Sequence, residues 1–354
     1  MTKTTKIIVG LSGGVDSSVS AYLLKQQGYD VHGVFMQNWE DDKDSEFCTI
    51  KQDSMDAIAI ADTIGIDIDI VNFAHEYKER VFQHFLTEYQ NGRTPNPDVF
   101  CNSEIKFKAF LDYAITQKAD YIATGHYVNK VITNNGECLA RAIDNNKDQS
   151  YFLYRLNQYQ ISKSIFPLAT MTKPEVRQLA SKIGLTNALK KDSTGICFIG
   201  ERPFREFLQQ YMPITEGNII TPDGKVIGRH IGLMYYTIGQ RKGLGIGGQG
   251  EPWFVAQKNL ATNELIVVQG HNHPLLLNTE VIANQLTFGQ NNKPKEGYYT
   301  AKTRYRMQDA KCILTYLSAD KIHLQFETPQ WAITPGQSVV IYDQHLCLGG
   351  GIIM

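Results

Sequence analysis

The sequence lacks several features that would place it in a familiar class of protein. No uninterrupted apolar run reaches the length of a membrane span, and residues 1–6 are too short and too polar for a signal peptide. The formal net charge is −1, so no global basic field indicates a nucleic-acid partner, and any RNA contact must come from local patches. These absences predict a soluble cytoplasmic protein with no membrane partner.

Cysteine is also sparse. Six cysteines in 354 residues do not form a disulfide scaffold, so in a reducing compartment they are free, metal-bound or catalytic. No Cys-x-x-Cys pair occurs, which argues against zinc and iron–sulfur sites. Cys101 and Cys197 lie in polar segments that contain proline or glycine. Buried structural thiols are the expectation for the other four, Cys48, Cys138, Cys312 and Cys347.

Strand-like and helix-like patterns alternate through the first third of the chain. We expect strands at residues 6–11, 31–36, 66–73 and 120–124, and helices at residues 19–27, 55–64 and 79–89. Residues 172–175 carry the capping pattern of a later helix start. The alternation predicts an α/β fold with a doubly wound parallel sheet, in which ligands bind beyond the carboxyl ends of the strands.

The second half of the chain has a different pattern. Beyond Pro213 glycine becomes frequent and helical periodicity disappears. Near the C-terminus Ile322, Leu324 and Phe326 alternate with polar residues, as half-buried strands do. These patterns predict a small central domain followed by a C-terminal β-barrel. We place the three domains at residues 1–203, 204–272 and 273–354.

A glycine- and serine-rich turn follows the first expected strand and precedes the first expected helix. Glycines let the backbone approach a phosphate, and the first N–H groups of a helix bind anions. The Gly-Lys-Ser/Thr ending of the common kinase-type loop is missing, and Asp16 suggests a bound Mg²⁺ instead. Met36 and Gly125 follow other strands, so they can converge with this turn on one nucleotide.

A second polar segment, residues 91–102, contains two prolines, Pro95 and Pro97. We expect these prolines to hold the segment extended and to prevent a helix. Asp98 and Cys101 would then lie in a constrained loop, which is a good place for chemistry. A third segment, residues 193–200, contains Cys197.

These motifs together resemble those of the tRNA-specific 2-thiouridylases, which belong to the ATP pyrophosphatase superfamily and place sulfur on the wobble uridine of certain tRNAs. The phosphate loop alone matches only the superfamily, whereas the cysteine motifs are specific to the family. The matching segments run in order along nearly the whole chain: residues 12–17, 96–98 with 101–102, 125–127, 147–151, 193–200, 237–243 and 301–306.

The resemblance implies an N-terminal domain of the adenine nucleotide alpha hydrolase type that uses ATP and Mg²⁺. The C2 oxygen of uridine 34 would form an adenylate with release of pyrophosphate, and sulfur would then displace AMP. Asp16 is the implied metal ligand. The implied nucleotide-binding residues are Gly10, Leu11, Ser12, Gly13, Gly14, Val15, Asp16, Ser17, Met36 and Gly125.

The resemblance also implies how sulfur arrives. A cysteine desulfurase or a sulfur-relay protein would load a persulfide onto Cys197. Cys101 would either release sulfide from that persulfide or attack the activated carbon, and it would end in a disulfide with Cys197. Both cysteines would need lowered pKa values to act as thiolates. Asp98 would serve as a general acid or base beside the target uracil.

Basic and aromatic residues, together with the resemblance, imply the surface that contacts the anticodon stem-loop of tRNA. Positive charges would bind phosphates, and rings would stack on splayed bases. A base that is modified within an anticodon must be flipped into a pocket. The implied contact residues are Asn96, Pro97, Asp98, His126, Lys147, Asp148, Gln149, Arg304, Tyr305 and Gln337.

Other functions stay open on the residues alone. The same loop serves amide-forming synthetases, which would not need the paired cysteines, and thiocytidine-forming enzymes, which use Cys-x-x-Cys cluster ligands absent here. A non-catalytic RNA-binding protein with a vestigial nucleotide pocket is the alternative from a different class. ATP consumption separates that alternative from the enzymes.

Overall fold

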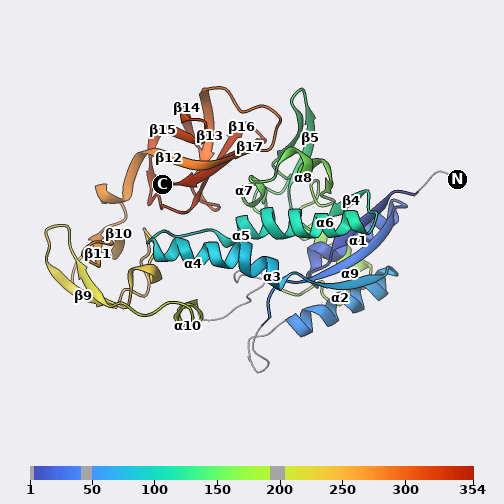
Figure 1. The fold of residues 1–354 in the computed structure, drawn as a ribbon, viewed down its shortest axis with the longest axis horizontal. Helices are drawn as coiled ribbons and strands as arrows, with labels where there is room; N and C mark the ends of the chain where they lie inside the picture. The colour runs from blue at the N-terminus through green and yellow to red at the C-terminus, as the bar shows by residue number, and fades with distance from the viewer. Residues whose placement is uncertain (1–3, 41–49, 192–203) are drawn as a thin grey trace.

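The fold is an N-terminal α/β part, a small central sheet and a C-terminal β-barrel, which lie beside one another along the molecule (Figure 1). The structure is a computed structural model that describes residues 4–40, 50–191 and 204–354. None of the helices within these ranges is both long and apolar enough to cross a membrane.

The N-terminal sheet is parallel and has the strand order β3-β2-β1-β4-β7. Ile7 and Val9 pack on one face with α1, α2 and α9, whereas Ile8 packs on the other face with Phe107 and Phe110. Helices therefore cover both faces, as the alternation predicted. The strands are β1 (Lys6–Gly10), β2 (Asp30–Gln37), β3 (Ile68–Asn72), β4 (Tyr121–Ala123) and β7 (Ser164–Ile165).

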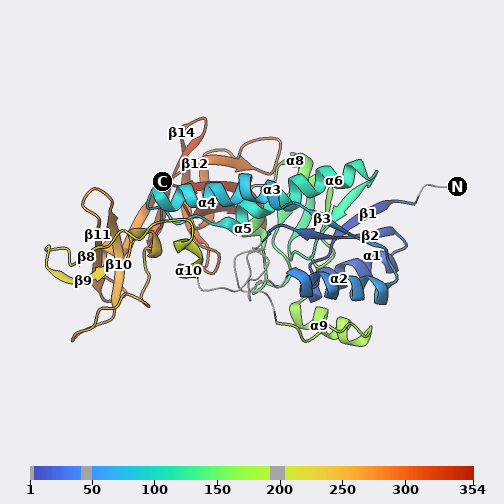
Figure 2. The ribbon, with the colours of Figure 1, turned by 60° about the horizontal axis from the view of Figure 1, so that its bottom comes forward.

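The first face carries α1 (Val15–Gln26), α2 (Ile50–Ile64) and α9 (Lys173–Lys182), which Figure 2 shows together on one side of the sheet. The second face carries two irregular rods. One is α3 (Ala74–Tyr77), a π-helical stretch η1 (Lys78–Phe82) and α4 (Gln83–Gln90). The other is α5 (Pro97–Phe100), a longer π-helix η2 (Cys101–Ala109) and α6 (Phe110–Thr116).

The expectation that prolines keep residues 91–102 extended is wrong from Pro97 onward. Proline is accommodated in the first turn of a helix because its missing N–H needs no partner there. Asn96 caps this helix, and its Oδ1 accepts a bond from the Val99 N–H at 3.4 Å. Cys101 therefore lies in a continuous helical rod rather than in a loop.

A hairpin of β5 (Asn129–Thr133) and β6 (Gly136–Ala140) joins the N-terminal part to the barrel. Strand β6 pairs with β17, so the two parts share one sheet. The short helices α7 (Ser150–Leu153) and α8 (Gln158–Ser162) follow.

The barrel is a closed ring of six strands, because β12 pairs with both β15 and β17. Ile322, Leu324 and Phe326 are buried in its core, which confirms the alternation seen in the sequence. Strand β17 contains a glycine run where a Cβ on Gly350 would lie 2.0 Å from the Val339 carbonyl oxygen. The strands are β12 (Leu277–Phe288), β13 (Gly297–Lys302), β14 (Ala310–Ser318), β15 (Lys321–Trp331), β16 (Ser338–Asp343) and β17 (Leu346–Ile353).

The central part lies at the end of the molecule opposite the N-terminal sheet (Figures 1 and 2). Its four-stranded sheet has the order β10-β11-β8-β9. Phe207 of the preceding helix packs on Phe82 with ring centres 5.7 Å apart, which connects this part to the rod that contains α4. The elements are α10 (Phe204–Gln209), β8 (Gly217–Ile220), β9 (Val226–His230), η3 (Leu233–Tyr235), β10 (Trp253–Asn259), β11 (Glu264–Gln269) and η4 (Pro274–Leu276).

Candidate functional site

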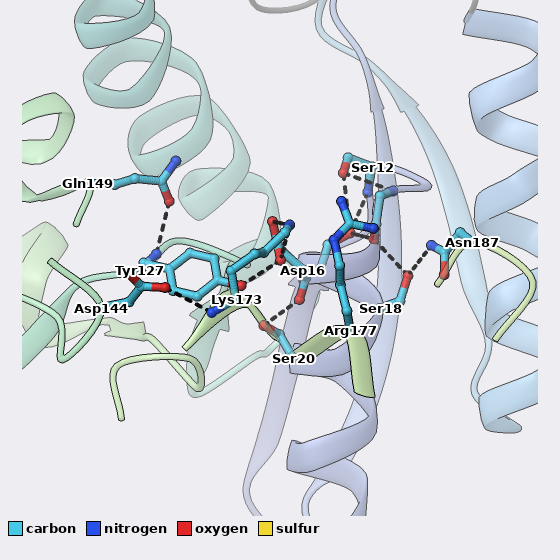
Figure 3. Close-up of polar contacts among 12 residues, drawn as sticks. Ser12, Asp16, Ser18, Ser20, Tyr127, Asp144, Gln149, Lys173, Arg177 and Asn187 are labelled. Atoms are coloured by element: carbon cyan, nitrogen blue, oxygen red, sulfur yellow. Dashed lines mark hydrogen bonds and ion pairs between the residues drawn. The ribbon is translucent and has the colours of Figure 1, made fainter. Parts of the chain in front are cut away.

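The glycine-rich turn between β1 and α1 is a pre-formed anion site (Figure 3). Ser17 Oγ accepts a bond from the Ser12 N–H at 3.2 Å and donates to the Gly14 carbonyl at 3.0 Å. Gly14 is the N-cap residue of α1 and offers no side chain to the first N–H groups of that helix. A Cβ on Gly125 would lie 2.6 Å from the Ser17 nitrogen, so only glycine lets the segment after β4 approach this turn.

Asp16 is held by two side chains from distant parts of the sequence (Figure 3). The Lys173 ammonium group lies 2.8 Å from Oδ1 and 2.7 Å from Oδ2, and the Tyr127 hydroxyl donates to Oδ1 at 2.8 Å. Lys173 is buried in the first turn of α9. A lysine therefore lies beside the glycine-rich turn, although it comes from α9 and not from the turn itself.

The start of α9 is fixed so that Lys173 faces the loop. The N–H and hydroxyl of Thr172 donate to Glu175 at 2.7 and 2.8 Å, and the Lys173 N–H donates to Asp144 at 2.9 Å. The sequence showed this helix start, but not what Lys173 would face. The contact joins residues 157 positions apart, and no local pattern reports such a distance.

Two further side chains lie beside the phosphate loop. Asn187 Nδ2 donates to the Gly13 carbonyl at 3.0 Å and to Ser18 Oγ at 2.9 Å. Arg177 follows Lys173 by one turn of α9, and it donates to the Ala188 carbonyl at 2.7 Å. Both residues escaped the sequence analysis, because they lie far along the chain from the glycine-rich turn.

The residues fit a magnesium ion only if the phosphates of a nucleotide complete its coordination. Asp16 is the one carboxylate in the loop, and its oxygens already face Lys173 and Tyr127. Among the described residues there is no group of three histidine, cysteine or acidic side chains that could hold a metal by itself. Mg²⁺ is commonly bound by one or two carboxylates together with substrate phosphates and water.

A cavity of about 430 Å³ brings together six of the ten residues expected to contact tRNA. Its walls come from the segment before α5, from α7, from the central part and from the barrel. The Tyr305 ring lies 4.4 Å from the Phe152 ring at one wall. The lining residues are Pro95, Asn96, Pro97, Asp98, Phe152, Thr237, Arg304, Tyr305, Arg306 and Gln337.

Arg304 and Gln337 use part of their hydrogen-bonding capacity inside the protein. Nη2 of Arg304 lies 2.7 Å from the Ile238 and Ala332 carbonyl oxygens and 2.6 Å from Thr334 Oγ1. Burial lowers the pKa of this guanidinium. Nε2 of Gln337 donates to the Thr94 carbonyl at 2.8 Å. Both side chains therefore hold the walls of the cavity in place.

Residues 147–149 connect the phosphate loop to the barrel. Asp148 is buried and accepts bonds from the Ala142 N–H at 3.1 Å and from Ser150 Oγ at 2.8 Å. Gln149 Oε1 accepts a bond from the Tyr127 N–H at 2.9 Å. Lys147 and Gln149 are both half-exposed, and of these three residues only Lys147 carries a positive charge that suits an RNA phosphate.

Cys101 is completely buried at the start of the π-helix η2. Cys138, Cys312 and Cys347 are free and buried, as expected of structural thiols. Cys197 and Cys48 lie outside the described residues. Lys190, close before the Cys197 segment, pairs with Asp53 at 2.8 Å and with Asp56 at 2.7 Å.

His126 is buried after β4, and its Nδ1 lies 2.8 Å from Thr124 Oγ1. Burial, helped by the charge of Lys106, holds the pKa of His126 well below 6.5. The imidazole is therefore neutral, so it can contact RNA by stacking or hydrogen bonding rather than through charge.

Comparisons with known proteins match the three parts of the chain in order. Family models cover residues 5–201 (tRNA methyl transferase HUP domain), 205–269 (tRNA methyl transferase PRC-barrel domain) and 278–353 (aminomethyltransferase beta-barrel domain). The tRNA-specific 2-thiouridylase MnmA of Neisseria meningitidis serogroup C (strain 053442) is 66% identical over 350 residues, which cover 99% of this chain and 95% of that protein. The MnmA of Thiobacillus denitrificans is 64% identical, with 99% of each chain covered.

Solved structures give only a distant likeness. A 4-thiouridine synthetase–RNA complex with bound ATP is 18% identical, with a TM-score of 0.35, and the match covers 59% of this chain and 50% of that one. The NMN synthetase of Francisella tularensis is 17% identical, with a TM-score of 0.35, and the match covers 58% of this chain and 72% of that one.

We expect Lys173→Met to weaken ATP binding by at least about tenfold, because a charge-assisted hydrogen bond is worth roughly 1.5–3 kcal/mol. Isothermal titration calorimetry with ATP measures the effect. Lys182→Met, at the exposed end of the same helix, is the matched control and should bind ATP normally. Equal ATP affinity in the Lys173→Met protein and the wild type would contradict a role in phosphate binding.

We expect His126 to make folding sensitive to acid. The folded protein keeps this imidazole neutral, whereas the unfolded chain binds a proton below pH 6.5, so its contribution to stability is present above that pH and is lost as pH falls. The loss approaches about 1.4 kcal/mol per pH unit. Urea unfolding at pH 7.5 and 5.5 should show a smaller loss for His126→Gln than for the wild type. Identical losses would contradict the neutral assignment.

Proposed function

The chain belongs to the tRNA-specific 2-thiouridylase family, and from that premise we propose how its own residues carry out ATP-dependent thiolation of the wobble uridine of tRNA. The observation that supports the mechanism most directly is that the chain contains two candidate sites. One is the glycine-rich turn at the end of β1, and the other is the cavity at Asp98, where the rod of α5, η2 and α6 begins. The glycine-rich turn holds Asp16 against Lys173, and the cavity of about 430 Å³ combines Asp98 with walls from the barrel.

ATP binds with its phosphates on the turn formed by Ser12, Gly13, Gly14, Val15, Asp16 and Ser17. Lys173 supplies positive charge from the opposite side, and Arg177 lies on the same face of α9. Gly10, Leu11, Met36 and Gly125 line the strand ends where the rest of the nucleotide lies. Asp16 would hold Mg²⁺ together with the phosphates, and the ion would neutralise charge that develops on them.

The flipped uracil occupies the cavity of about 430 Å³ beside Asp98. Asp98 holds the proton of N3, which increases the negative character of the C2 oxygen as that oxygen attacks the α-phosphorus of ATP. Pyrophosphate leaves and an adenylated uracil remains. The carbon is now activated, because AMP is a far better leaving group than the original oxygen.

Sulfur reaches that carbon from a persulfide on Cys197, which a cysteine desulfurase or a sulfur-relay protein loads. In one route the terminal sulfur of the persulfide attacks the carbon, and Cys101 then attacks Cys197 Sγ, so that the S–S bond breaks and the terminal sulfur stays on the uracil. In the other route Cys101 first attacks Cys197 Sγ and releases the terminal sulfur as sulfide, which then attacks the carbon. In both routes AMP leaves, the uracil keeps one sulfur atom, and Cys101 and Cys197 end as a disulfide. A dithiol reductant then restores both thiols.

The tRNA lies across all three parts of the chain, whose proposed domain limits are 1–203, 204–272 and 273–354. Tyr305 and Asn96 with Pro97 offer an aromatic face and a shaped wall at the cavity, and Lys147, outside its lining, offers charge. His126 adds a neutral ring. Arg304, Gln337 and Gln149 position these surfaces through the internal bonds already described, and their remaining polar edges face the RNA, whereas the buried Asp148 positions them from within the protein.

The function is tested by incubating the purified protein with tRNA, ATP, a cysteine desulfurase, cysteine and a dithiol reductant. Nucleoside analysis of the digested tRNA should show 2-thiouridine only when ATP is present, with one AMP and one pyrophosphate formed per thiolation. ATP consumption without thiolation favours an amide-forming synthetase, and tRNA binding without ATP consumption favours a non-catalytic RNA-binding protein. Either result would contradict the proposal.

We expect substitution of Cys197 and of Cys101 to block different steps of thiolation. Cys197→Ser should not accept a persulfide, whereas Cys101→Ser should carry one on Cys197 and yet make no 2-thiouridine. Mass spectrometry after incubation with a desulfurase and labelled cysteine, before tRNA is added, distinguishes the two proteins. Cys312→Ala is the control and should behave as the wild type. Stable label on Cys101 in the Cys197→Ser protein, or thiolation by Cys101→Ser at the wild-type rate, would reverse the assigned roles.

A further inference from the structure

Residues 92–97, which we call the base loop, connect the end of α4 to the start of α5. Residues 95–97 of this loop line the cavity of about 430 Å³ described above, which we call the base cavity. This loop belongs to the N-terminal part, but the other two parts of the chain hold it. Lys258 contacts it from the central sheet and Gln337 contacts it from the barrel. Nothing in the motifs of the sequence points to Lys258.

The central sheet meets the loop at Gly92. Gly92 has a left-handed φ of 70°, and a Cβ there would lie 2.6 Å from Leu260 Cδ2, so the turn is pressed against the central part. The Lys258 ammonium donates to the Gly92 carbonyl at 3.0 Å. A cation is favoured at this place, because the carbonyl ends of α4 point toward it.

The ammonium group of Lys258 loses hydration in this position. Desolvation lowers the pKa of its ammonium group to about 8. The side chain lines a second cavity, of about 870 Å³, which shares no lining residue with the base cavity. Lys258 therefore acts on the base loop without lining the place where the base would bind.

The barrel meets the loop at Thr94. The Thr94 N–H donates to the Pro335 carbonyl at 2.9 Å, and Gln337 Nε2 donates to the carbonyls of Thr94 at 2.8 Å and Pro95 at 3.3 Å. Gly336 has a φ of 90°, and a Cβ on it would lie 2.9 Å from the Thr94 nitrogen. The two backbones therefore lie in direct contact.

The position of the base loop determines that of Asp98 and Cys101, because only a short and rigid segment separates them from it. Pro95 and Pro97 restrict the backbone, Asn96 caps α5, and α5 continues without a break into the π-helix that begins at Cys101. Asp98 and Cys101 therefore move with the loop. A displacement of about 1 Å in such groups can cost on the order of 100-fold in rate.

We propose that Lys258 is a positioning residue for thiolation, which together with Gln337 fixes the base loop and hence Asp98 and Cys101. The central part and the barrel thereby complete the active site of the N-terminal part. This inference rests on the proposed function, because it takes Asp98 and Cys101 as the groups that act on the base.

The test compares Lys258→Met, which keeps the apolar stem but removes the donor, with Lys258→Arg, which keeps a cationic donor. We expect the single-turnover thiolation rate at saturating tRNA to fall at least about tenfold in Lys258→Met. The dissociation constants for tRNA and ATP should stay within about twofold of the wild type, and Lys258→Arg should restore most of the rate. Lys225→Met, on an exposed turn of the same sheet, is the matched control.

An unchanged rate in a folded Lys258→Met protein would overturn the proposal, and so would a loss of tRNA affinity that accounts for the slower rate. If that variant does not fold, Leu260→Ala tests the same end of the loop, because the Leu260 side chain packs against Gly92, and the same split is expected between rate and tRNA affinity. Weaker tRNA binding as its sole defect would overturn the positioning role. A wild-type protein that makes no 2-thiouridine would instead contradict the proposed function.

Discussion

The ion pair between Asp16 and Lys173 is the contact on which the arrangement of the site depends. The Lys173 side chain is 10% exposed and that of Asp16 is 30% exposed, so Lys173 is the member for which loss of the partner would leave a buried charge. The pair fixes α9 against α1 and places a cation at the phosphate loop. Tyr127 extends the contact, because its hydroxyl binds Asp16 while its backbone binds Gln149. Ser150 then meets the Tyr342 hydroxyl of the barrel at 3.2 Å, so hydrogen-bonded segments run from the phosphate loop into the barrel.

The barrel is joined to the N-terminal part by direct contacts and contributes residues to the lining of the cavity. Strand β17 pairs with β6 of the N-terminal part, and Tyr151 donates to the Ser338 carbonyl at 3.0 Å. Arg304 joins the central part to the barrel through Ile238 and Ala332. A cavity with walls from all three parts has its shape only while these contacts hold. The shape of the cavity proposed to bind the flipped base therefore depends on the assembly of the three parts.

The sequence predicted what local patterns determine. The parallel sheet with helices on both faces, the capping pattern before α9 and the alternation in β15 all appear in the structure. It failed where distant segments meet, as with Lys173 and Asp16, since spacing along the chain carries no such information. It also failed at Pro97, which fits a first helical turn as well as an extended segment. The π-helices were missed because the spacing of a few apolar residues cannot distinguish a π-helix from an α-helix.

The burial of Cys101 has a chemical consequence. An adenylated base and a persulfide are both destroyed by water or stray thiols, so the group that acts on them must work where solvent is excluded. Cys101 has no exposed surface, and the neighbouring Asn102 amide donates to the Phe152 carbonyl at 3.2 Å, behind the ring that lines the base cavity. A π-helix at this point spaces its side chains differently from an α-helix, and such segments are frequent at functional sites. In the proposed mechanism, the burial of Cys101 protects its thiol from solvent.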